Sequence, residues 1–471
     1  MFRTLLGSHM RWMSLKDMLK QDMLLLGAPG PIRRRIALNY CQSQGRSWEY
    51  VSLTRDVTES DLKQRREIYN RKDAIWTNQP VVRAALSGSI LILEGLENAE
   101  RNVLPILNNL LENREMHLEN GEHIISFEKY TMLREKYSEK ELAMEGLKYA
   151  HPDFRVVATC VPVPPFSGLS MDPPLRSRFQ ARYIEDASLP EMLDAFGNSN
   201  KTTITVPPTL PLALQAVDAY RRAQPPLQRG QYHALLSDAQ VDVALKILTA
   251  HPKEETIASV IPRVLPALPG QQIFSRILSE FQGMPKHSSQ QLQQETNMLG
   301  GNASASASAT ASASASANTY GTVRAQALRD LQLGLHICLM GGAGKSFLAS
   351  ELPQLLGGTS AMIVPLFRDM SSRDLLATRV TSVDGNTDWV HSPIIQAAIE
   401  GKVVILEGIE ELYRDSLSVL HPLLQDGFIA LPSGQVLRAG DIHPAFRVIA
   451  TVHSSDDAWL TDDLAHLFTF H

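Results

Sequence analysis

The stretch HICLMGGAGKS, His336 to Ser346, decides the fold, because it reads as a buried strand that runs into a phosphate-binding loop. Glycines allow backbone N–H groups to close around phosphate oxygens, and the helical-looking FLASELPQLL that follows presents its positive N-terminus to an anion. A lysine in such a loop reaches the β- and γ-oxygens, and a Ser or Thr hydroxyl ligates magnesium. The stretch therefore predicts a nucleotide site that contains Lys345 and Ser346.

This loop is shorter than the usual one, in which a glycine stands six positions before the lysine, so about two residues are absent. Leu339 occupies the position of that glycine. On the loop alone, a glycine turn with a chance Lys-Ser pair is an open alternative. The rest of the chain has to decide between the two interpretations.

A related pattern lies near the start of the chain, where the apolar run QDMLLL, residues 21–26, enters GAPGPIRRR. This loop has the full length but a different chemistry. Ile32 replaces the second glycine, Arg33 replaces the lysine, and Arg34 replaces the hydroxyl residue that ligates magnesium. Arginine can hold a phosphate but cannot ligate a metal ion, so we expect a binding-only or decayed site. Its candidate phosphate contacts are Gly27, Gly30 and Arg33.

An internal repeat predicts that the chain contains one domain twice. When the sequence is shifted by 313 positions, residues 54–111 align with 367–424 without a gap and share 20 of 58 residues. Average composition would give about three or four identities. The shared residues include the run Ile-Leu-Glu-Gly and leucines at helical spacing. Because the two loops stand at equivalent places, the repeat strongly favours the phosphate-loop interpretation of GGAGKS.

Each copy reads as alternating strands and helices, which is typical of a parallel sheet with helices on both faces. The apolar runs SILILEG and FRVVATC of the first copy correspond to VVILEG and FRVIATV of the second. A hairpin is predicted between the two runs of each copy, with turns at Asn120-Gly121 and Ser433-Gly434. The first copy has 21 extra residues here, since the offset falls from 313 to 292.

Carboxylates at the strand ends are candidates for nucleotide hydrolysis. Such a site needs one carboxylate to hold magnesium and usually a second to orient the attacking water. Glu407 suits the first role, as does Glu94 in the first copy. The next residues, Gly408 and Gly95, stand where the water-orienting glutamate is usual. Glu410 is the candidate for that second role, and an ordinary carboxylate at a helix N-terminus is the alternative.

Polar residues after the second central strand are candidates for sensing the γ-phosphate. They are Thr159 in the first copy and Thr451, with His453, in the second. A threonine that simply ends a strand is an equally good interpretation.

The segment DPPLRSRFQ places Arg176 and Arg178 just before a helical region. In a ring of subunits, such an arginine points at the neighbour's γ-phosphate; as isolated residues, the two would be surface charges. The second copy has no arginine after Arg447. The chain ends at His471, where we expect the matching segment and a second helical lid to begin.

Composition fits a soluble globular protein of two or three domains, since 471 residues are enough for several cores. Hydrophobic residues make up 44%, charged residues 20%, and the net charge of −5 gives no basic excess for nucleic acid. The three cysteines stand far apart, which argues against a disulfide framework or a cysteine metal site and fits a reducing compartment. No apolar run reaches the ~18 residues of a membrane span.

The N-terminal segment allows two interpretations. It contains Arg3, Arg11 and Lys16 and no acidic residue before Asp17. It is either a short mitochondrial presequence or the first helix of the domain.

The residues after the first copy predict helices and no strands. They consist of amphipathic stretches separated by proline clusters, and they contain no continuous apolar run of the kind that forms a strand. An Ala/Ser-rich spacer of low complexity follows and predicts a flexible linker. The predicted domains are a first core with a degenerate loop (1–180), a helical lid (181–298), the linker (299–320) and a second core that ends before its lid (321–471).

Together these features resemble the AAA+ ATPases, specifically the branch that includes MoxR, dynein and midasin. That branch carries a hairpin within its second helix, which VTSVDGNTDW, Val380 to Trp389, fits. The phrases TRDVTESDLKQRREI, LILEGLENAERNVLPILNNLLENREM and DPPLRSRFQAR are similar to a family of large mitochondrial proteins with several AAA+ modules and a C-terminal von Willebrand A domain. In that family the first loop is similarly degenerate, and the second is full-length and ends in Gly-Lys-Thr.

The resemblance implies tandem P-loop AAA+ modules in a larger remodelling or chaperone-like ATPase, located in mitochondria or otherwise in the cytoplasm. It implies ATP and Mg²⁺ as cofactors, with neighbouring modules in a ring and an unknown protein client as partners. We expect the second module to be the nucleotide-competent one, and an inactive scaffold is the alternative. The expected nucleotide contacts are Gly341, Gly342, Ala343, Gly344, Lys345 and Ser346; the metal ligands are Ser346 and Glu407; the catalytic residues are Glu407, Glu410, Arg176 and Arg178.

Overall fold

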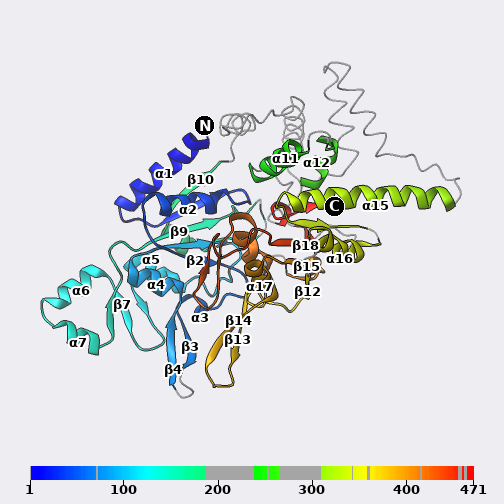
Figure 1. Cartoon of the computed structure of the whole chain (residues 1–471). Helices are drawn as coiled ribbons and strands as arrows, with labels where there is room; N and C mark the ends of the chain where they lie inside the picture. The colour runs from blue at the N-terminus through cyan, green and yellow to red at the C-terminus, as the bar shows by residue number, and fades with distance from the viewer. Residues whose placement is uncertain are drawn as a thin grey trace.

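The computed structural model of the chain contains two α/β halves that lie side by side (Figure 1). The first half ends at residue 185, and the second begins at residue 309. The structure describes residues 2–69, 73–164, 166, 168–185, 238–251, 254–255, 257–264, 309–341, 343–357, 361–413, 416–453, 459–460 and 464–471.

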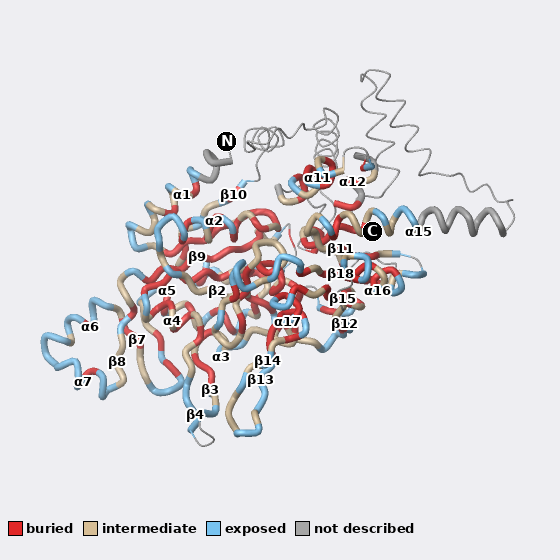
Figure 2. Tube along the Cα trace, viewed as in Figure 1, coloured by how far each residue is buried: buried red, intermediate tan, exposed pale blue. Residues whose placement is uncertain are grey.

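The first half is built on a five-stranded parallel sheet with the order β10-β1-β9-β5-β2. One face is covered by α1 and α2 and the other by α4 and α5 (Figure 2, buried strands in red). Its strands are β1 (Met23–Gly27), β2 (Trp48–Ser52), β5 (Ile90–Glu94), β9 (Arg155–Cys160) and β10 (Gln180–Ile184). Its helices are α1 (Phe2–Met18), α2 (Ile32–Ser43), α3 (Glu59–Leu62), α4 (Pro80–Ser87), α5 (Ile106–Asn113) and α8 (Pro173–Ser177).

Alternation along the strands explains how both faces are filled. Successive side chains of a strand point to opposite faces. Leu25 and Ile92 therefore pack under α1 and α2, and Leu24 and Leu93 pack under α4 and α5. Burial of each such side chain contributes roughly 1.5–3 kcal/mol. The continuous apolar runs thus form central strands buried on both faces, as the sequence predicts.

The second half repeats this sheet. Its order, read from the same edge, is β19-β11-β18-β15-β12, and every neighbouring pair is parallel. Its strands are β11 (Ile337–Leu339), β12 (Ala361–Pro365), β15 (Val403–Glu407), β18 (Arg447–Thr451) and β19 (Thr469–Phe470). Its helical elements are α15 (Ala309–Gln332), α16 (Lys345–Leu355), α17 (Pro393–Glu400), η1 (Ile409–Glu411), η2 (Ser416–Leu420), the π-helical η3 (Pro422–Asp426) and η5 (Leu464–His466).

The predicted hairpins are present in both halves. Each half carries a long hairpin before its central strand and a short one after it. The long hairpins are β3 (Gln64–Tyr69) with β4 (Asp73–Asn78), and β13 (Ala377–Thr381) with β14 (Thr387–His391). The short ones are β6 (Met116–His117) with β7 (His123–Ile125), and β16 (Ile429–Ala430) with β17 (Val436–Leu437).

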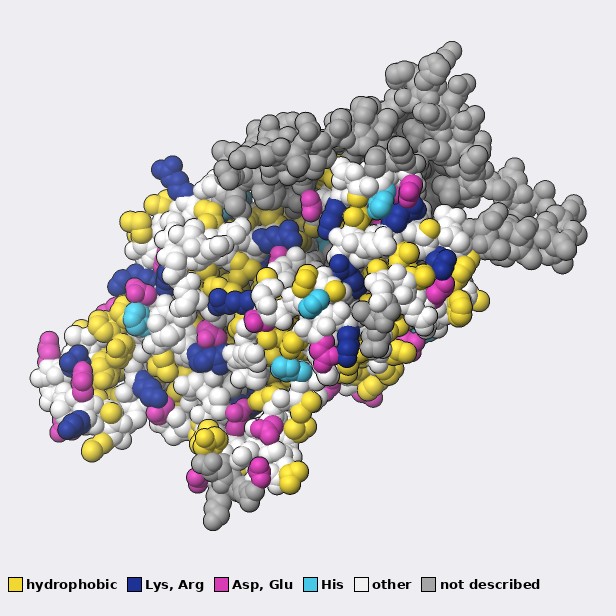
Figure 3. Space-filling view, viewed as in Figure 1, with side chains coloured by type: hydrophobic (Ala, Val, Ile, Leu, Met, Phe, Trp, Pro, Cys, Tyr) yellow, Lys and Arg dark blue, Asp and Glu magenta, His cyan; other side chains and the backbone are white. Residues whose placement is uncertain are grey.

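The extra residues of the first half form α6 (Phe127–Arg134), α7 (Glu139–Met144) and β8 (Leu147–Tyr149), which pairs with β7. Met132 and Met144 in this insertion are exposed, as are Ile68 and Val383 on the long hairpins. Figure 3 shows apolar side chains in yellow at both places.

Most of the predicted lid lies outside the described residues. Its described helices, α11 (Asp238–Ala250) and α12 (Ile257–Val264), lie beside α15 of the second half (Figure 1). Arg263 of α12 donates to both Asp330 carboxylate oxygens at 3.1 Å. Two predicted boundaries shift, because α15 is helical from Ala309 within the expected linker and β10 extends the first core to Ile184.

The N-terminal segment forms α1, and Met13 on it is fully buried against the first sheet. The Tyr40 hydroxyl on α2 donates to the Asp17 carboxylate at 2.7 Å and ties the two helices together. Residues 2–18 are therefore a packed helix, and a targeting role remains a prediction. No helix among the described residues is long and apolar enough to cross a membrane.

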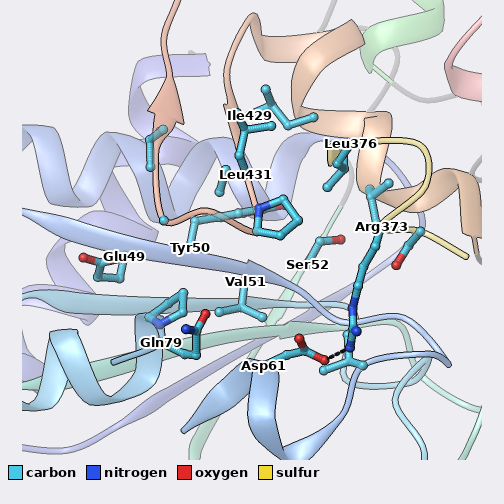
Figure 4. A pocket seen from close by; sticks show the side chains of 18 of the residues that line it. Glu49, Tyr50, Val51, Ser52, Asp61, Gln79, Arg373, Leu376, Ile429 and Leu431 are labelled. Carbon is cyan, nitrogen blue, oxygen red and sulfur yellow. Dashed lines mark hydrogen bonds and ion pairs between the residues drawn. The ribbon is translucent and has the colours of Figure 1, made fainter. Parts of the chain in front are cut away.

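The two halves meet through the edge strand β2 and the hairpin β16–β17. Phe428 packs edge-on against Trp48 and Tyr50, with ring centroids 5.5 and 5.3 Å apart. A cavity of about 100 Å³ lies beside this contact, between Tyr50 on one side and Ile429 and Leu431 on the other (Figure 4). The Arg373 guanidinium of the second half and the Asp61 carboxylate of the first form an ion pair at its rim (Figure 4).

Candidate functional site

The second loop joins the end of β11 to the start of α16 and is open. Gly341 and Gly344 have φ angles of 80° and 99°, which favour glycine, and a Cβ at either would meet no atom within 4 Å among the described residues. Gly342 lies outside the described residues. Leu339 is buried in β11, so the short loop follows directly from the strand's end.

Lys345 opens α16, with Gly344 as its N-cap. Ala343 and Ser346 are exposed, Lys345 is half-buried, and the Phe347 ring is 67% exposed. Within the described part of the chain, the Lys345 ammonium and the Ser346 hydroxyl form no hydrogen bond or ion pair. Both polar groups are therefore free to meet an anion and a metal at a helix N-terminus.

The predicted carboxylates lie at the ends of neighbouring strands. Glu407 is the register partner of Thr451, because β15 and β18 are paired to their last residues. The buried Thr451 hydroxyl donates to the Leu406 carbonyl at 3.5 Å, and the Glu410 carboxylate accepts from the His453 backbone N–H at 2.5 Å. These bonds fix Thr451 and Glu410 at the carboxyl edge of the sheet, where ligands bind in such folds.

The pKa of the Cys338 thiol, in β11, is influenced by two of the predicted site residues, Glu410 and Lys345. Burial raises the pKa of Cys338, the Glu410 carboxylate raises it further, and the Lys345 ammonium opposes both. Lys345 and Glu410 thus both lie near the end of β11. Ser346 and Glu407 offer hydroxyl and carboxylate oxygens, the donors that Mg²⁺ prefers, so the residues of the second loop fit Mg²⁺ together with a phosphate.

The first loop is closed instead of open. A Cβ at Gly27 would stand 2.8 Å from the Ile184 carbonyl oxygen, so only glycine fits there. Gly30 has a φ of 127°, and the His466 ring of the second half lies 3.7 Å from where its Cβ would be. Arg33 and Arg34 are only 5% and 1% exposed. Residues of both halves therefore enclose this loop.

Arg34 is the centre of a network that joins the two halves. Its Nη1 donates to Glu94 Oε1 at 2.8 Å, and its Nε donates to Asp426 Oδ2 at 2.6 Å. Its Nη2 donates to Gln425 Oε1 at 2.6 Å. The Tyr50 hydroxyl donates to the other Glu94 oxygen. Burial and the neighbouring Glu94 raise the pKa of Tyr50, so this hydroxyl remains a donor.

Mg²⁺ does not fit the first loop. The Arg34 guanidinium lies against Glu94, the carboxylate that would have to ligate the metal. A doubly charged ion ~4 Å from that guanidinium would be repelled by about 8 kcal/mol at an effective dielectric constant of 20. No hydroxyl replaces the lost ligand, since Arg34 itself occupies that position. The Arg34–Glu94 ion pair thus excludes Mg²⁺ on electrostatic grounds, and whether the loop binds phosphate stays a prediction.

Arg176 and Arg178 lie on and just after α8, away from the second loop. Arg176 is exposed, and Arg178 forms an ion pair with Glu112 at 2.6 Å. Neither side chain forms a hydrogen bond or ion pair with the described residues of the loop 341–346. Among the described residues, the side-chain partners of Arg178 are Ser177 and Glu112, and neither belongs to a loop.

The sequence prediction that the matching segment begins only after His471 is wrong. Met23 is the register partner of Gln180, and Ile337 is the register partner of Thr469. The segment LRSRF that precedes Gln180 therefore corresponds to LAHLF, residues 464–468. The segment is present, but alanine and leucine replace its arginines, and His466 contacts the first loop.

Sequence reasoning also missed Gln425, Asp426 and Tyr50, which complete the first loop. Gln425 and Asp426 come from nearly 400 residues further along the chain, and nothing in their local sequence marks them. His466 could have been found, because LAHLF aligns with LRSRF once the final strand is recognised. Strand β19 has only the residues Thr469–Phe470, which is too short to recognise from its apolar pattern.

Comparison with protein families identifies the fold family of both halves. The model of the family described as "AAA domain (dynein-related subfamily)" matches residues 22–179 and again 336–468. The two matched stretches contain both loops and four of the five strands of each sheet, and each stretch ends just before the edge strand β10 or β19.

Known proteins are also similar to this chain. The chain is 34% identical to von Willebrand factor A domain-containing protein 8 of Mus musculus over 98% of its own length, and it spans 27% of that protein. It is 32% identical to Midasin of Dictyostelium discoideum over 29% of the chain and 2% of that protein. It is 30% identical to Protein NorQ of Paracoccus denitrificans over 23% of the chain and 40% of that protein. The sheets, the loops and these matches together establish that the chain belongs to the AAA ATPases of the dynein-related subfamily, a family of ATP-binding modules.

Proposed function

We propose that the chain is a tandem pair of AAA modules from a larger remodelling ATPase, and that the second module holds Mg-ATP. The main observation behind this proposal is the open loop at the start of α16, where the half-buried Lys345 and the exposed Ser346 lie beside the sheet edge that bears Glu407. The phosphates would lie against the backbone N–H groups of Gly341, Gly342, Ala343 and Gly344.

Each residue of this site has a separate role in the proposal. Lys345 would pair with the β- and γ-phosphate oxygens, and Ser346 and Glu407 would hold Mg²⁺, which stabilises the charge that develops on the transferred phosphate. Glu410 would orient the attacking water, although its carboxylate now accepts from the His453 N–H. Thr451 would position the end of the strand next to the γ-phosphate.

The first module would contribute residues to the nucleotide site of an adjacent module. Its two arginines, Arg176 and Arg178, form no hydrogen bond or ion pair with the described residues of either loop and would complete the site of an adjacent module in a ring. The contact between the first loop and His466 is an example of the contact expected between adjacent modules, because it places the LAHLF segment of one module against the loop of another. ATP binding would order the junctions between modules, and hydrolysis would loosen them again. The resulting movement of the modules would act on a bound client protein.

The proposal also assigns domain boundaries and a location in the cell. Residues 181–298 would form the lid of the first module and 321–471 the second core. The basic N-terminal segment, with Arg3, Arg11 and Lys16, would direct the protein to mitochondria. Import of a fluorescent fusion of residues 1–30 into mitochondria would support this location, and a purely cytoplasmic signal would refute it.

Titration calorimetry with Mg-ATP tests the nucleotide site. We expect Lys345→Ala to weaken binding by about ten- to a hundredfold, because a charge-assisted bond to phosphate contributes about 1.5–3 kcal/mol. Lys402→Ala is the matched control, since Lys402 pairs with Glu400 on the surface of the same module. Unchanged affinity in the Lys345→Ala protein would overturn the proposal.

A second candidate function is a scaffold that binds nucleotide without turnover. It is favoured by Gly408, which follows Glu407 where a water-orienting glutamate is usual, and by the short loop. Steady-state ATPase assays on the full-length protein separate the two functions. Turnover that is lost in Glu407→Gln supports the ATPase, and absence of turnover in the wild type supports the scaffold.

A further inference from the structure

Equivalent positions of the two halves provide different partners for an arginine. The shift of 313 positions that defines the repeat aligns Arg55 with Arg368, and it also aligns Glu100 with Tyr413. In the first half the partner is an acid, because Arg55 Nε donates to Glu100 Oε1 at 3.1 Å. In the second half the partner is the neutral ring of Tyr413, and the Arg368 Cζ lies 5.4 Å from its centroid. The second half therefore has the arginine of this pair without the negative charge.

The Tyr413 ring also lies close to an arginine of the other half. The Arg55 Cζ is 5.7 Å from the ring centroid, so one guanidinium from each half is near the same ring. Guanidinium groups at this distance are attracted by the electrons of an aromatic face. A negative charge on the Tyr413 side chain would thus meet two cations, one from each half.

Contacts between the halves keep Arg55 in this place. The residues on either side of it both contact Ser372 of the second half. Asp56 Oδ2 accepts from the Ser372 backbone N–H at 2.9 Å and from its hydroxyl at 2.7 Å, and the Thr54 and Ser372 hydroxyl oxygens are 3.2 Å apart. The backbone of Arg55 is therefore fixed beside the second half, while its side chain is 65% exposed and can turn toward a new partner.

The Tyr413 hydroxyl is accessible. Tyr413 is 45% exposed, and its hydroxyl forms no hydrogen bond with a residue that the structure describes. Leu412, just before it, has an extended backbone with φ −69° and ψ 152°, so the chain leaves η1 in a form that a modifying enzyme can bind. Arg368 is exposed as well and pairs with no carboxylate among the described residues. A phosphate on this hydroxyl would find one cation unpaired and a second, Arg55, paired only with an exposed acid.

We propose that Tyr413 is a phosphorylation site whose phosphate binds Arg368 and Arg55 and so fastens the two halves together. A tyrosine kinase transfers the γ-phosphoryl group of ATP to Tyr413 Oη. The new O–P bond forms as the bond to the departing ADP oxygen breaks, and the hydroxyl proton passes to the kinase's base. A phosphatase reverses the change by hydrolysis, which returns the phenol and releases inorganic phosphate. Tyr413 belongs to neither loop, so the proposal goes beyond nucleotide binding and does not depend on it.

The charge of the phosphate gives the physical reason for a tighter junction. Phosphotyrosine carries about −1.5 to −2 charges at pH 7, and a guanidinium can donate two parallel hydrogen bonds to its oxygens. Its pair with Arg368 would reproduce the ion pair between Arg55 and Glu100 of the first half. Arg55 would exchange Glu100 for the phosphate, because an exposed ion pair contributes little. The acid nearest in the sequence, Glu411, is exposed, so solvent and salt weaken its repulsion.

The full chain with phosphotyrosine incorporated at position 413 tests the contact. The matched control has phosphotyrosine at position 137, since Tyr137 is 52% exposed and lies in the insertion of the first half. In phosphorus NMR, the phosphate at 413 should lose its second proton at a pH about one unit lower than the phosphate at 137, because two guanidinium groups favour the dianion. The Tm should rise by about 2–4 °C for position 413 alone. Equal titration and equal Tm for the two positions would overturn the proposal.

Substitution of the two arginines identifies the contacts. In the chain phosphorylated at Tyr413, Arg368→Gln and Arg55→Gln should each remove part of both shifts, and the double variant should remove them entirely. Without the phosphate, Arg368→Gln should leave the Tm unchanged, because this side chain is exposed and has no carboxylate partner among the described residues. A lost Tm increase then reports a lost contact and not a loss of fold. Shifts that persist in the double variant would contradict the assignment.

Treatment of the native chain with a tyrosine kinase of broad specificity and Mg-ATP tests whether an enzyme reaches the hydroxyl. Mass spectrometry of the digested protein should locate phosphate on Tyr413. Tyr413→Phe should lose both that phosphate and the accompanying rise in Tm. Phosphate on Tyr137 without any on Tyr413 would show that the folded protein withholds this hydroxyl, and the proposal would fail.

Discussion

The two loops of this chain occupy equivalent places in equivalent sheets and have opposite surroundings. The first has the full length, carries arginines, and is enclosed by the second half. The second is short, carries Lys345 and Ser346, and is open. The difference shows that one residue can decide the surroundings of such a loop. The arginine at the hydroxyl position of the first loop, Arg34, contacts Glu94 of its own half and Gln425 and Asp426 of the other half, where the second loop has the exposed Ser346.

The segments before the last strand of each sheet, LRSRF in the first half and LAHLF in the second, also differ in charge. The segment of the second half that meets the first loop contains His466 and no arginine, whereas the equivalent segment of the first half retains Arg176 and Arg178. The loop that does not fit Mg²⁺ therefore faces a segment without arginine. In the proposed function, arginines of this segment would assist hydrolysis only at a loop that holds Mg-ATP.

The largest effect is expected from the arginines. Replacing Arg176 and Arg178 with alanine should lower ATP turnover of the assembled protein by about a thousandfold, because such arginines contribute 10³–10⁵ in rate. Nucleotide affinity should be unchanged, since neither residue contacts a loop of its own chain. Steady-state assays and calorimetry check both expectations, with Arg134→Ala as control. A parallel loss of affinity would instead place the arginines in the binding site.

Arg34→Met should destabilise the protein by about 3–5 kcal/mol, because removing one partner of a buried ion pair leaves Glu94 and Asp426 uncompensated. The equivalent change at the exposed second loop, Ser346→Ala, should alter the free energy of unfolding by less than about 0.5 kcal/mol. Urea unfolding followed by tryptophan fluorescence measures both. Equal effects at the two positions would contradict the contrast between the loops.

The halves also differ at the entrance to their loop strands, where Asp22 in the first corresponds to His336 in the second. Burial, reinforced by Arg447, lowers the pKa of His336 to about 3. Its neutral Nδ1 accepts from the Val448 N–H at 3.1 Å, a bond that protonation would break.

Stability of the second half should therefore depend on pH. In the unfolded chain this histidine titrates near 6.5, so it takes up a proton at pH 5 while the folded form does not. Stability is then full above about pH 6.5 and falls by about 2 kcal/mol between pH 6.5 and 5. Unfolding curves at several pH values should be flatter for His336→Asn. A steeper dependence in that variant would contradict the assignment.

The smallest effect is expected at the metal position of the second loop. Ser346→Ala should reduce the advantage of Mg-ATP over metal-free ATP by about 1 kcal/mol, or roughly fivefold, through loss of one oxygen ligand. Affinity for ATP in EDTA should not change. If Ser346→Ala weakened both forms equally, the hydroxyl would contact phosphate and not metal.

Much of the fold could be predicted because the information is local. The continuous apolar runs identified the central strands, and the repeat identified the second sheet from the first. The junction could not be predicted, because Gln425 and Asp426 meet Arg34 only through packing between the halves. The expectation that the segment matching LRSRF begins after His471 was wrong for a related reason. Strand β19 is a two-residue element with no apolar pattern to recognise, so the segment before it was overlooked.

The metal dependence of ATP binding to the full chain tests most directly whether the two loops differ in their chemistry. Equilibrium dialysis should show one nucleotide whose binding requires Mg²⁺ and is lost in Lys345→Ala, since only the second loop offers a lysine and a free hydroxyl. A Mg²⁺-dependent nucleotide that survives Lys345→Ala would contradict the account.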